Sequence, residues 1–350
     1  MQADEVWDGL RLAGGWLDFT AVETIERRQG GQALRRILGL GGFAERDWGG
    51  ATLAMAEAFE ALQRPRPRVC GLAMDRPVIM GILNVTPDSF SDGGRLDSAA
   101  AAVAHARRLV EEGAGIIDIG GESTRPGAEP IDVDKECRRV LPVIEALAGT
   151  IEARISIDTR NAETMRRAVA AGADIVNDVS ALSHDRAAIE TVAELGVPVV
   201  LMHARGDPRT MQDRPEYGDV VLDVFDALAA KVQVAMAGGV LRERILVDPG
   251  LGFGKTIEHN LALMGSLSVF HGLGVPILLG ASRKSFIGRL TGVEAASERV
   301  AGSLGAAIAA LAQGVQILRV HDVAATRQAA DTWLASMTGL EPSRQGWRAT

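Results

Sequence analysis

The sequence predicts an α/β protein that folds as a (β/α)8 TIM barrel with a small N-terminal extension. Short apolar runs rich in β-branched residues alternate with amphipathic stretches rich in Ala, Glu and Arg, the pattern of a parallel sheet with crossover helices. Several amphipathic stretches end in glycine, as at Gly113, Gly172 and Gly196, and glycine commonly caps the C-terminal end of a helix. No G-x-G-x-x-G follows the first apolar run, which disfavours a dinucleotide-binding open sheet.

Eight strands are expected, and their starts lie roughly 20–45 residues apart, the usual length of a βα unit. The strands are Val78–Val85, Gly115–Gly120, Arg154–Thr159, Ile175–Ser180, Val197–His203, Arg244–Pro249, Pro276–Ser282 and Gln316–Asp322. Two of the helices between them, Ser98–Glu112 and Glu163–Ala171, are clear because their apolar residues recur at i, i+3 and i+4. Eight such units favour a closed barrel over an open sheet.

The N-terminal residues do not fit this repeat. Residues 1–68 are expected to form an extension and linker, residues 69–340 the barrel, and residues 341–350 a C-terminal tail. The stretch RPRPR at Arg64–Arg68 predicts a stiff connector with solvated arginines, since proline favours an extended backbone. The following VCGLAMDRPVIMGILNV predicts a hairpin that feeds the first barrel strand.

Composition narrows the class of protein. The net charge of −8 argues against a nucleic-acid binder that relies on bulk attraction to phosphate. No run approaches the ~20 apolar residues that span a membrane, and the acidic start MQADEVWDGL has no apolar core of a signal peptide. The two cysteines, Cys70 and Cys137, form no C-x-x-C and are interpreted as free thiols. We expect a soluble cytoplasmic protein.

The strand ends carry the chemistry, because the carboxyl ends of all strands of a parallel barrel gather on one face. Every expected strand ends in polar, sulfur-containing or ionisable residues: Asn84; Asp118, Glu122, Thr124 and Arg125; Asp158; Asn177 and Asp178; Met202 and His203; Asp248; Ser282, Arg283 and Lys284; Arg319, His321 and Asp322. A single such residue is most often a turn or capping residue. Burying several unpaired carboxylates costs several kcal/mol each, so their convergence predicts a polar active site.

The charges of these residues suggest a ligand with two parts. Carboxylates such as Asp158 and Asp248 can each accept two parallel hydrogen bonds from a nitrogen heterocycle. Arg125, Lys284 and Arg319 suit an anion, and barrels often bind phosphate in the loops after strands seven and eight. The residues themselves therefore predict a polar heterocycle joined to a phosphate.

Two other motifs do not withstand inspection. GLGFGKT resembles the end of a phosphate-binding loop, but Pro249 occupies the position of its first glycine. His203 and His321 lack the helical spacing of a zinc-enzyme signature. The other four histidines, His105, His184, His259 and His271, are expected at the surface.

A family resemblance rests on eight segments in order. They are MGILNVTPDSFSDGG, DIGGESTRPGA, ISIDTR, NDVSA, LMHARGDPRTMQ, DPGLGFGKT, GASRKSFIG and RVHDV. Together they resemble the bacterial dihydropteroate synthases, from about Val78 to about Ala335. The N-terminal extension lies outside the resemblance.

The resemblance implies a Mg²⁺-dependent transferase of folate synthesis that joins 6-hydroxymethyl-7,8-dihydropterin pyrophosphate to p-aminobenzoate and releases pyrophosphate. It implies catalytic roles for Asp118, Asp158, Lys284 and Arg319. The implied pterin-binding residues are Asp158, Asn177, Met202, Asp248, Phe253 and Lys284. The implied pyrophosphate-binding residues are Asn84, Arg125, Arg319 and His321, with Asn84 as the metal ligand. The implied p-aminobenzoate pocket comprises Phe90, Thr124, Pro126, Ser282 and Lys284.

The resemblance further implies a homodimer. Our mechanistic hypothesis is a dissociative displacement without a protein nucleophile. In it, loop residues after Asn84, including Asp88 and Phe90, cover the substrates. Pro126 stands in STRPG without inserted residues, so inhibition by sulfonamides is expected. Two alternatives stay open: a pterin-dependent methyltransferase, which would have no anionic leaving group for the cations to bind, and a non-catalytic pterin-binding protein.

Overall fold

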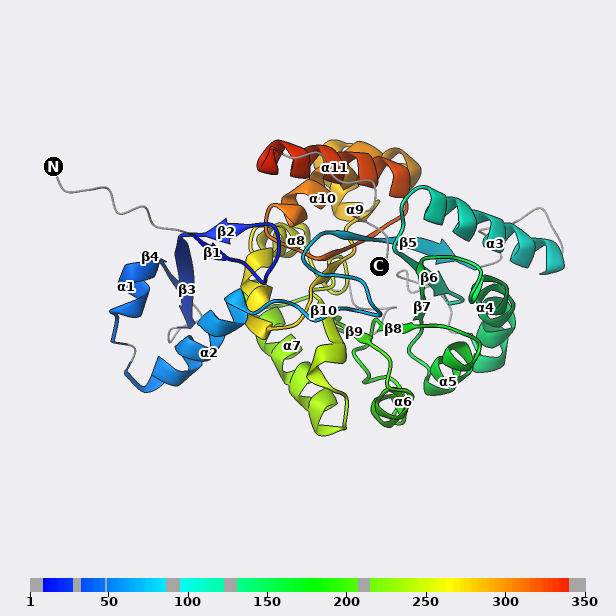
Figure 1. Ribbon diagram of the computed structural model, residues 1–350, viewed down its shortest axis with the longest axis horizontal. Coiled ribbons are helices and arrows are strands. Elements are labelled where there is room, and N and C mark those ends of the chain that lie inside the picture. Colours follow the sequence, from blue (N-terminus) through cyan, green and yellow to red (C-terminus); the bar gives the residue numbers. More distant parts are fainter. Residues whose placement is uncertain are drawn as a thin grey trace.

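The computed structural model describes residues 9–27, 33–47, 49–85, 95–122, 131–206 and 215–339. Figure 1 shows a ring of strands surrounded by helices, with the N-terminal elements at one side of the ring.

Eight parallel strands form the centre of the molecule. They are β5 (Val78–Asn84), β6 (Ile116–Gly120), β7 (Arg154–Asp158), β8 (Ile175–Asp178), β9 (Val199–Met202), β10 (Ile245–Asp248), β11 (Leu278–Leu279) and β12 (Ile317–Val320). Their order is β10-β9-β8-β7-β6-β5-β12-β11, and a bridge between Val247 and Ile277 joins β10 to the residue before β11. The predicted barrel is confirmed, and every strand lies within the range expected for it.

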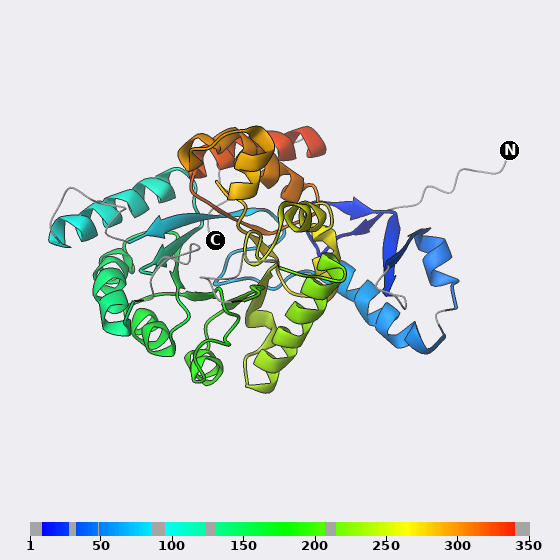
Figure 2. The same cartoon turned by 180° about the vertical axis from the view of Figure 1, so that it is seen from behind.

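Helices follow the strands and cover the outside of the barrel (Figures 1 and 2). They are α3 (Arg95–Glu111), α4 (Val133–Leu147), α5 (Ala162–Ala170), α6 (Ala188–Leu195), α7 (Val220–Ala237), α8 (Ile257–Met264), α9 (Ser285–Thr291), α10 (Val300–Leu311) and α11 (Val323–Thr338). Local sequence sets their ends: the Asp132 carboxylate accepts from the Lys135 amide before α4, and Gly196 ends α6 with a left-handed backbone at φ 64°. The two helices expected most clearly correspond to α3 and α5.

Apolar side chains form two buried clusters. The larger lies between the strands and the helices, where Ile144 and Leu147 of α4 are completely buried. The smaller contains barrel residues such as Met80 and Ile116 together with Val69, Leu72 and Met74, which precede the first strand. The prediction that this segment forms a hairpin with the first barrel strand is wrong. Residues 69–74 make only a tight turn, closed by a Val69–Leu72 bridge, and their apolar side chains pack against the barrel.

The N-terminal elements form two small sheets and two helices beside the barrel. Strands β1 (Leu10–Arg11) and β2 (Asp18–Phe19) pair, as do β3 (Ala21–Arg27) and β4 (Ala33–Gly39), and α1 (Leu40–Ala44) and α2 (Thr52–Gln63) follow. Phe43 stacks on Phe59 with a centroid distance of 4.7 Å, and Phe19 meets the same ring edge-on at 6.3 Å. These aromatic contacts supply a local core that is separate from the barrel.

Two sequence expectations fail where this region meets the barrel. Arg66 is not solvated: it is buried, and its guanidinium donates to the carbonyls of Ala61, Arg64 and His271. His271 is not at the surface either, because its segment (Leu267–Leu273, η4) lies under the extension and its ring is fully buried. Burial lowers the pKa of His271 to about 4, so this histidine is neutral.

The sequence also predicted that no segment spans a membrane and that both cysteines are free thiols. Among the described helices, none combines the length and apolar character needed to cross a bilayer. Cys70 and Cys137 are both free thiols, and burial raises the pKa of Cys70 to about 12. A thiol with so high a pKa is a poor nucleophile, so Cys70 is a structural residue.

Candidate active site

Three charged side chains from three strands meet at the carboxyl end of the barrel. The Arg319 guanidinium on β12 donates from Nε to Asp118 Oδ2 on β6 at 2.6 Å and from Nη2 to Asp158 Oδ2 on β7 at 2.7 Å. Asp118 is fully buried and also accepts from Ser156 Oγ at 2.6 Å and Asn177 Nδ2 at 3.1 Å. The sequence placed these residues together, and the structure brings them into direct contact.

The strand register explains why this cluster forms. Gly120, Asp158 and Asn177 lie side by side on β6, β7 and β8, and Asp118 is paired with Ser156 one layer below. Alternate residues of a strand face the same side, so Asp118 and Gly120 share the inner face. A Cβ on Gly120 would come within 3.5 Å of Asp158 Cβ, so glycine leaves room for the carboxylate.

Burial shifts the titration of Asp158, and the charges around it modify the shift. Burial raises its pKa to about 7, the Arg319 cation opposes the rise, and the nearby Asp118 carboxylate adds to it. Asp158 therefore changes its charge near neutral pH, which is typical of carboxylates in functional sites.

Beside this cluster, Lys284 and Asp248 form a second charged group with Phe253. Lys284 follows β11, donates to the Leu251 carbonyl, and holds its ammonium 4.9 Å from the centroid of the Phe253 ring. Burial lowers the pKa of Lys284 to about 8, against the opposing influence of Asp248. Asp248 is buried, and its Oδ1 accepts from the Gly250 amide at 2.7 Å.

The two groups are neighbours at Gly280, just after β11. A Cβ on this glycine would lie 3.9 Å from both Arg319 Cδ and Lys284 Nζ. The mouth of the barrel thus carries the cations Arg319 and Lys284 and the carboxylates Asp118, Asp158 and Asp248, so a ligand with donors and an anionic tail would find partners for both.

Lys255 is a site residue that the sequence analysis missed. It is 3% exposed, and its ammonium donates to the carbonyls of Gly250 and Phe253 at 2.8 and 3.0 Å. The same Nζ lies 3.0 Å from His203 Nδ1, so it ties the end of β9 to the loop after β10. The signal was present: a lone lysine in a loop with three glycines that follows Asp248 directly.

Several other expected residues have mainly structural contacts. The Asp178 carboxylate accepts from the amides of Ser180 and Leu182 and from the Ser180 hydroxyl, and so it organises its own turn. Arg283 forms a two-point ion pair with Asp322, at 3.0 and 2.5 Å.

The Ser282 hydroxyl lies 3.0 Å from His321 Nδ1 and joins the ends of the last two strands. Met202 is buried at the end of β9, whereas Asn84 is half-buried at the end of β5. Phe90, Thr124, Arg125 and Pro126 lie outside the described residues, as does Asp88.

The described part of the barrel mouth offers few protein ligands for a metal ion. Among the described residues, no cluster of three or more His, Cys, Asp or Glu could hold one. The Asn84 amide oxygen would lie 3.8 Å from a Cβ on Gly120, beside Asp158. Mg²⁺ usually keeps several waters and binds one or two protein oxygens plus substrate phosphates, so this single neutral oxygen fits Mg²⁺ that arrives with a phosphorylated ligand.

Comparisons with known proteins agree with this site. Residues 80–321 match the family model described as "Pterin binding enzyme". The dihydropteroate synthase of Escherichia coli K12 is 46% identical over 273 residues, which cover 78% of this chain and 96% of that protein. A Xanthomonas albilineans dihydropteroate synthase solved with 4-aminobenzoic acid is 50% identical, has a TM-score of 0.74 and covers 78% of this chain and 99% of its own.

The same Xanthomonas protein solved with 7,8-dihydropteroate is 47% identical, has a TM-score of 0.71 and again covers 78% of this chain and 99% of its own. The match is therefore nearly complete for the relatives, while the N-terminal part of this chain before residue 80 lies outside the family model. The chain belongs to the pterin-binding enzyme family, in its dihydropteroate synthase group.

Proposed function

We propose that this protein is a dihydropteroate synthase, a transferase that condenses 6-hydroxymethyl-7,8-dihydropterin pyrophosphate with p-aminobenzoate. The observation that carries the proposal is the cluster at the barrel mouth, where Arg319 joins Asp118 and Asp158 while Lys284 faces Phe253. A fused nitrogen ring needs such acceptors, and a diphosphate needs such cations. The family membership supports the same reaction.

We assign the pterin to the slot between the two charged groups. A dihydropterin presents a ring N–H beside an exocyclic amine, and a buried carboxylate can accept both bonds at once. Asp248 and Asp158 are the candidates, with Asn177 offering both a donor and an acceptor and Lys284 a donor. Met202 and Phe253 would line the faces of the ring. A site with buried carboxylates rejects analogues without the matching donors, because a carboxylate would remain unpaired.

We assign the pyrophosphate to the side of Asn84, Arg319 and His321, with Arg125 as a further cation. Arg319 already balances Asp118 and Asp158, so it acts partly by holding these acids in place. Mg²⁺, held by the Asn84 amide oxygen and the pyrophosphate, would neutralise charge on the leaving group. Cations placed where charge develops supply a large part of catalysis in such reactions.

We assign p-aminobenzoate to a pocket beside Ser282 and Lys284, completed by Phe90, Thr124 and Pro126. The ammonium of Lys284 suits the carboxylate of this substrate as well as a pterin acceptor. The Ser282–His321 contact joins the ends of the last two strands beside this pocket.

The reaction we propose needs no protein nucleophile. The bond from the pterin methylene carbon to the pyrophosphate oxygen breaks first, and the ring stabilises the cation that remains. The amine nitrogen of p-aminobenzoate then bonds to this carbon and loses a proton. The protein orients both partners and stabilises the leaving charge. A trapped covalent enzyme–pterin species would contradict this sequence of steps.

One assay separates the proposed synthase from its two alternatives. Pyrophosphate should be released only when the pterin substrate, p-aminobenzoate and Mg²⁺ are all present. A methyltransferase would release none, and a non-catalytic pterin-binding protein would bind the pterin without turnover. Sulfonamides, which imitate p-aminobenzoate, should inhibit release competitively; normal turnover at saturating sulfonamide would contradict the pocket assignment.

We further propose a cytoplasmic homodimer in which residues 1–68 form an added N-terminal unit. The half-buried face of α10 contains several small residues, which allow helices to approach closely. Sedimentation of the full chain tests the dimer, and fractionation of cells tests the location. A monomer at micromolar concentration would overturn the first assignment.

A further inference from the structure

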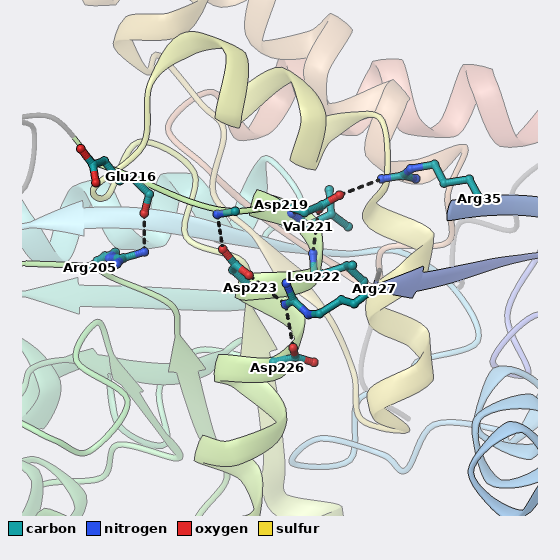
Figure 3. Close-up of polar contacts among 10 residues, drawn as sticks. Arg27, Arg35, Arg205, Glu216, Asp219, Val221, Leu222, Asp223 and Asp226 are labelled. Carbon is teal, nitrogen blue, oxygen red and sulfur yellow. Dashed lines mark hydrogen bonds and ion pairs between the residues drawn. The ribbon is translucent and has the colours of Figure 1, made fainter. Parts of the chain in front are cut away.

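The N-terminal extension, meaning the described residues among 9–68, contacts the barrel at α7. Figure 3 shows Arg27 and Arg35 on the β3–β4 hairpin opposite Asp219, Asp223 and Asp226. Arg27 lies 2.8 Å from Asp223 Oδ1 and 2.8 Å from Asp226 Oδ2, and Arg35 lies 3.9 Å from Asp219 Oδ2. In β3–β4 pairing, Arg35 is opposite Ile25, so both arginines project from one face of the hairpin.

The three acids are a complementary surface on the helix. Their spacing of i, i+4 and i+7 places them on one side of the first two turns of α7. Without the arginines, three like charges would repel one another there. The hairpin thus supplies the positive partners of an acidic helix start.

Asp223 links this contact to the segment that leads into α7. Its Oδ2 accepts from the Gly218 amide at 2.8 Å, while its Oδ1 meets Arg27. Tyr217, the residue before Gly218, donates from its hydroxyl to the Gly254 carbonyl at 2.8 Å. Arg205 covers the Tyr217 ring at 5.0 Å and donates to the Glu216 carbonyl. Residues Glu216–Gly218 therefore form a strap between the extension and the loop after β10.

That loop is the one that carries Phe253 and is fixed by Lys255. Gly254 has a left-handed backbone at φ 62°, and a Cβ there would come within 2.4 Å of the Arg205 carbonyl oxygen. The loop is hence in close backbone contact with Arg205, whose guanidinium holds the strap at the Glu216 carbonyl. A displacement of Tyr217 would shift the Gly254 carbonyl and with it the neighbouring Phe253.

The extension is anchored to the barrel independently of these ion pairs. The Trp16 indole donates to the Leu311 carbonyl at 3.0 Å, and buried Arg66 donates to the His271 carbonyl at 2.8 Å. These anchors hold the hairpin in place before Arg27 meets α7, so less conformational entropy is lost in forming the ion pairs.

We propose that the extension is an intramolecular clamp and that Arg27 is a positioning residue for the pterin slot, acting through Asp223, the Glu216–Gly218 strap and Gly254. The proposal rests on the proposed function for its substrate, the dihydropterin pyrophosphate. The clamp stabilises the loop geometry that the pterin meets and leaves the charged catalytic cluster unchanged.

The test compares Arg27→Met with Arg36→Met in the full chain. Arg36 lies on the same hairpin, pairs with Glu26 at 3.3 Å, and projects from the opposite face. Arg27→Met should raise the KM for the pterin substrate about three-fold, the scale of an exposed ion pair. The kcat and the KM for p-aminobenzoate should stay near the wild-type values, and Arg36→Met should change none of them. Arg27→Lys should restore the pterin KM, since it keeps the charge.

Salt and hydrogen exchange provide independent readouts. The difference between Arg27→Met and wild type should shrink as ionic strength rises, because exposed charges are screened. The Gly218 amide should exchange faster in Arg27→Met and not in Arg36→Met. Equal pterin KM and equal exchange in both variants would overturn the clamp. If the wild type releases no pyrophosphate while Gly218 exchange still separates the variants, the proposed function fails and the clamp stands.

Discussion

Two arginines in this molecule each lie between two aspartates at similar distances, but through different nitrogens and in different surroundings. Arg319 meets Asp118 and Asp158 at 2.6 and 2.7 Å, and Arg27 meets Asp223 and Asp226 at 2.8 Å each. The Arg319 side chain is 21% exposed with partners at 0% and 10%, whereas Arg27 is 47% exposed with partners at 26% and 62%.

The comparison shows that distance alone does not set the energy of an ion pair. Around Arg319, loss of the cation would leave two buried carboxylates without a counter-ion, which costs several kcal/mol. Around Arg27, water replaces the lost partner at once, and the pair contributes at most about 1 kcal/mol. The barrel mouth therefore depends on its charges for integrity, and the extension uses its charges for fine adjustment.

The largest effect is expected for Arg319→Met. It leaves Asp118 and Asp158 unpaired in a buried site, so the free energy of unfolding should fall by about 3–5 kcal/mol. Turnover should fall at least about a thousand-fold, the scale for loss of a preorganised electrostatic group. Urea unfolding measures the loss of stability, and pyrophosphate release measures the loss of turnover. A variant within 1 kcal/mol of wild type would show that the cluster is more hydrated than the structure indicates.

Lys255→Met should have the next largest effect. The variant loses hydrogen bonds to the Gly250 and Phe253 carbonyls, so about 2 kcal/mol of stability should be lost. The pterin KM should rise about ten-fold because the loop carrying Phe253 is released. Lys135→Met removes a lysine from an exposed position on α4 and is the matched control. Equal unfolding midpoints for both variants would contradict a pinning role for Lys255.

The fold and the membership of the site could be predicted, since both follow from periodicity and from the convergence of parallel strand ends. Asp118, Asp158 and Arg319 were placed at one rim for that reason. Their mutual pairing was not foreseen, because a strand pattern does not say whether a cation faces a ligand or a neighbouring acid.

Tertiary contacts decided the residues that sequence reasoning misjudged. Arg66 follows a proline in an apparently solvated linker, yet three carbonyls surround it. Arg27 and Asp226 are 199 residues apart, so no local pattern could connect them. Lys255 received no role from the sequence, because its burial depends on the end of β9 as well as on its own segment.

A smaller effect is expected from pH on the kcat/KM for the pterin substrate. It distinguishes Asp158 from Lys284, two buried groups at the barrel mouth with shifted pKa values. Asp158, with its pKa raised to about 7, accepts two parallel hydrogen bonds from the pterin only when ionised, above that pH. Lys284, with its pKa lowered to about 8, is a cation only below that pH. The kcat/KM for the pterin substrate should therefore rise toward pH 7 and fall above pH 8, as a bell-shaped profile of the free enzyme.

The conservative variant Lys284→Arg tests the assignment of the upper limb. Arginine stays charged throughout this range, so the fall above pH 8 should disappear while the rise toward pH 7 remains. An unchanged upper limb would mean that another group, on the protein or on the substrate, sets it.

The smallest effect is expected for Arg27→Met, the counterpart of Arg319→Met in which an arginine again loses two aspartate partners. Its free energy of unfolding should fall by less than about 1 kcal/mol, and most of that should vanish at high salt, since the charges are exposed. Arg319→Met should keep nearly its full loss at high salt, because buried charges are screened much less. Urea unfolding of both variants at low and high salt makes the comparison direct. Equal losses would mean that the hairpin and α7 exclude water as well as the barrel mouth does.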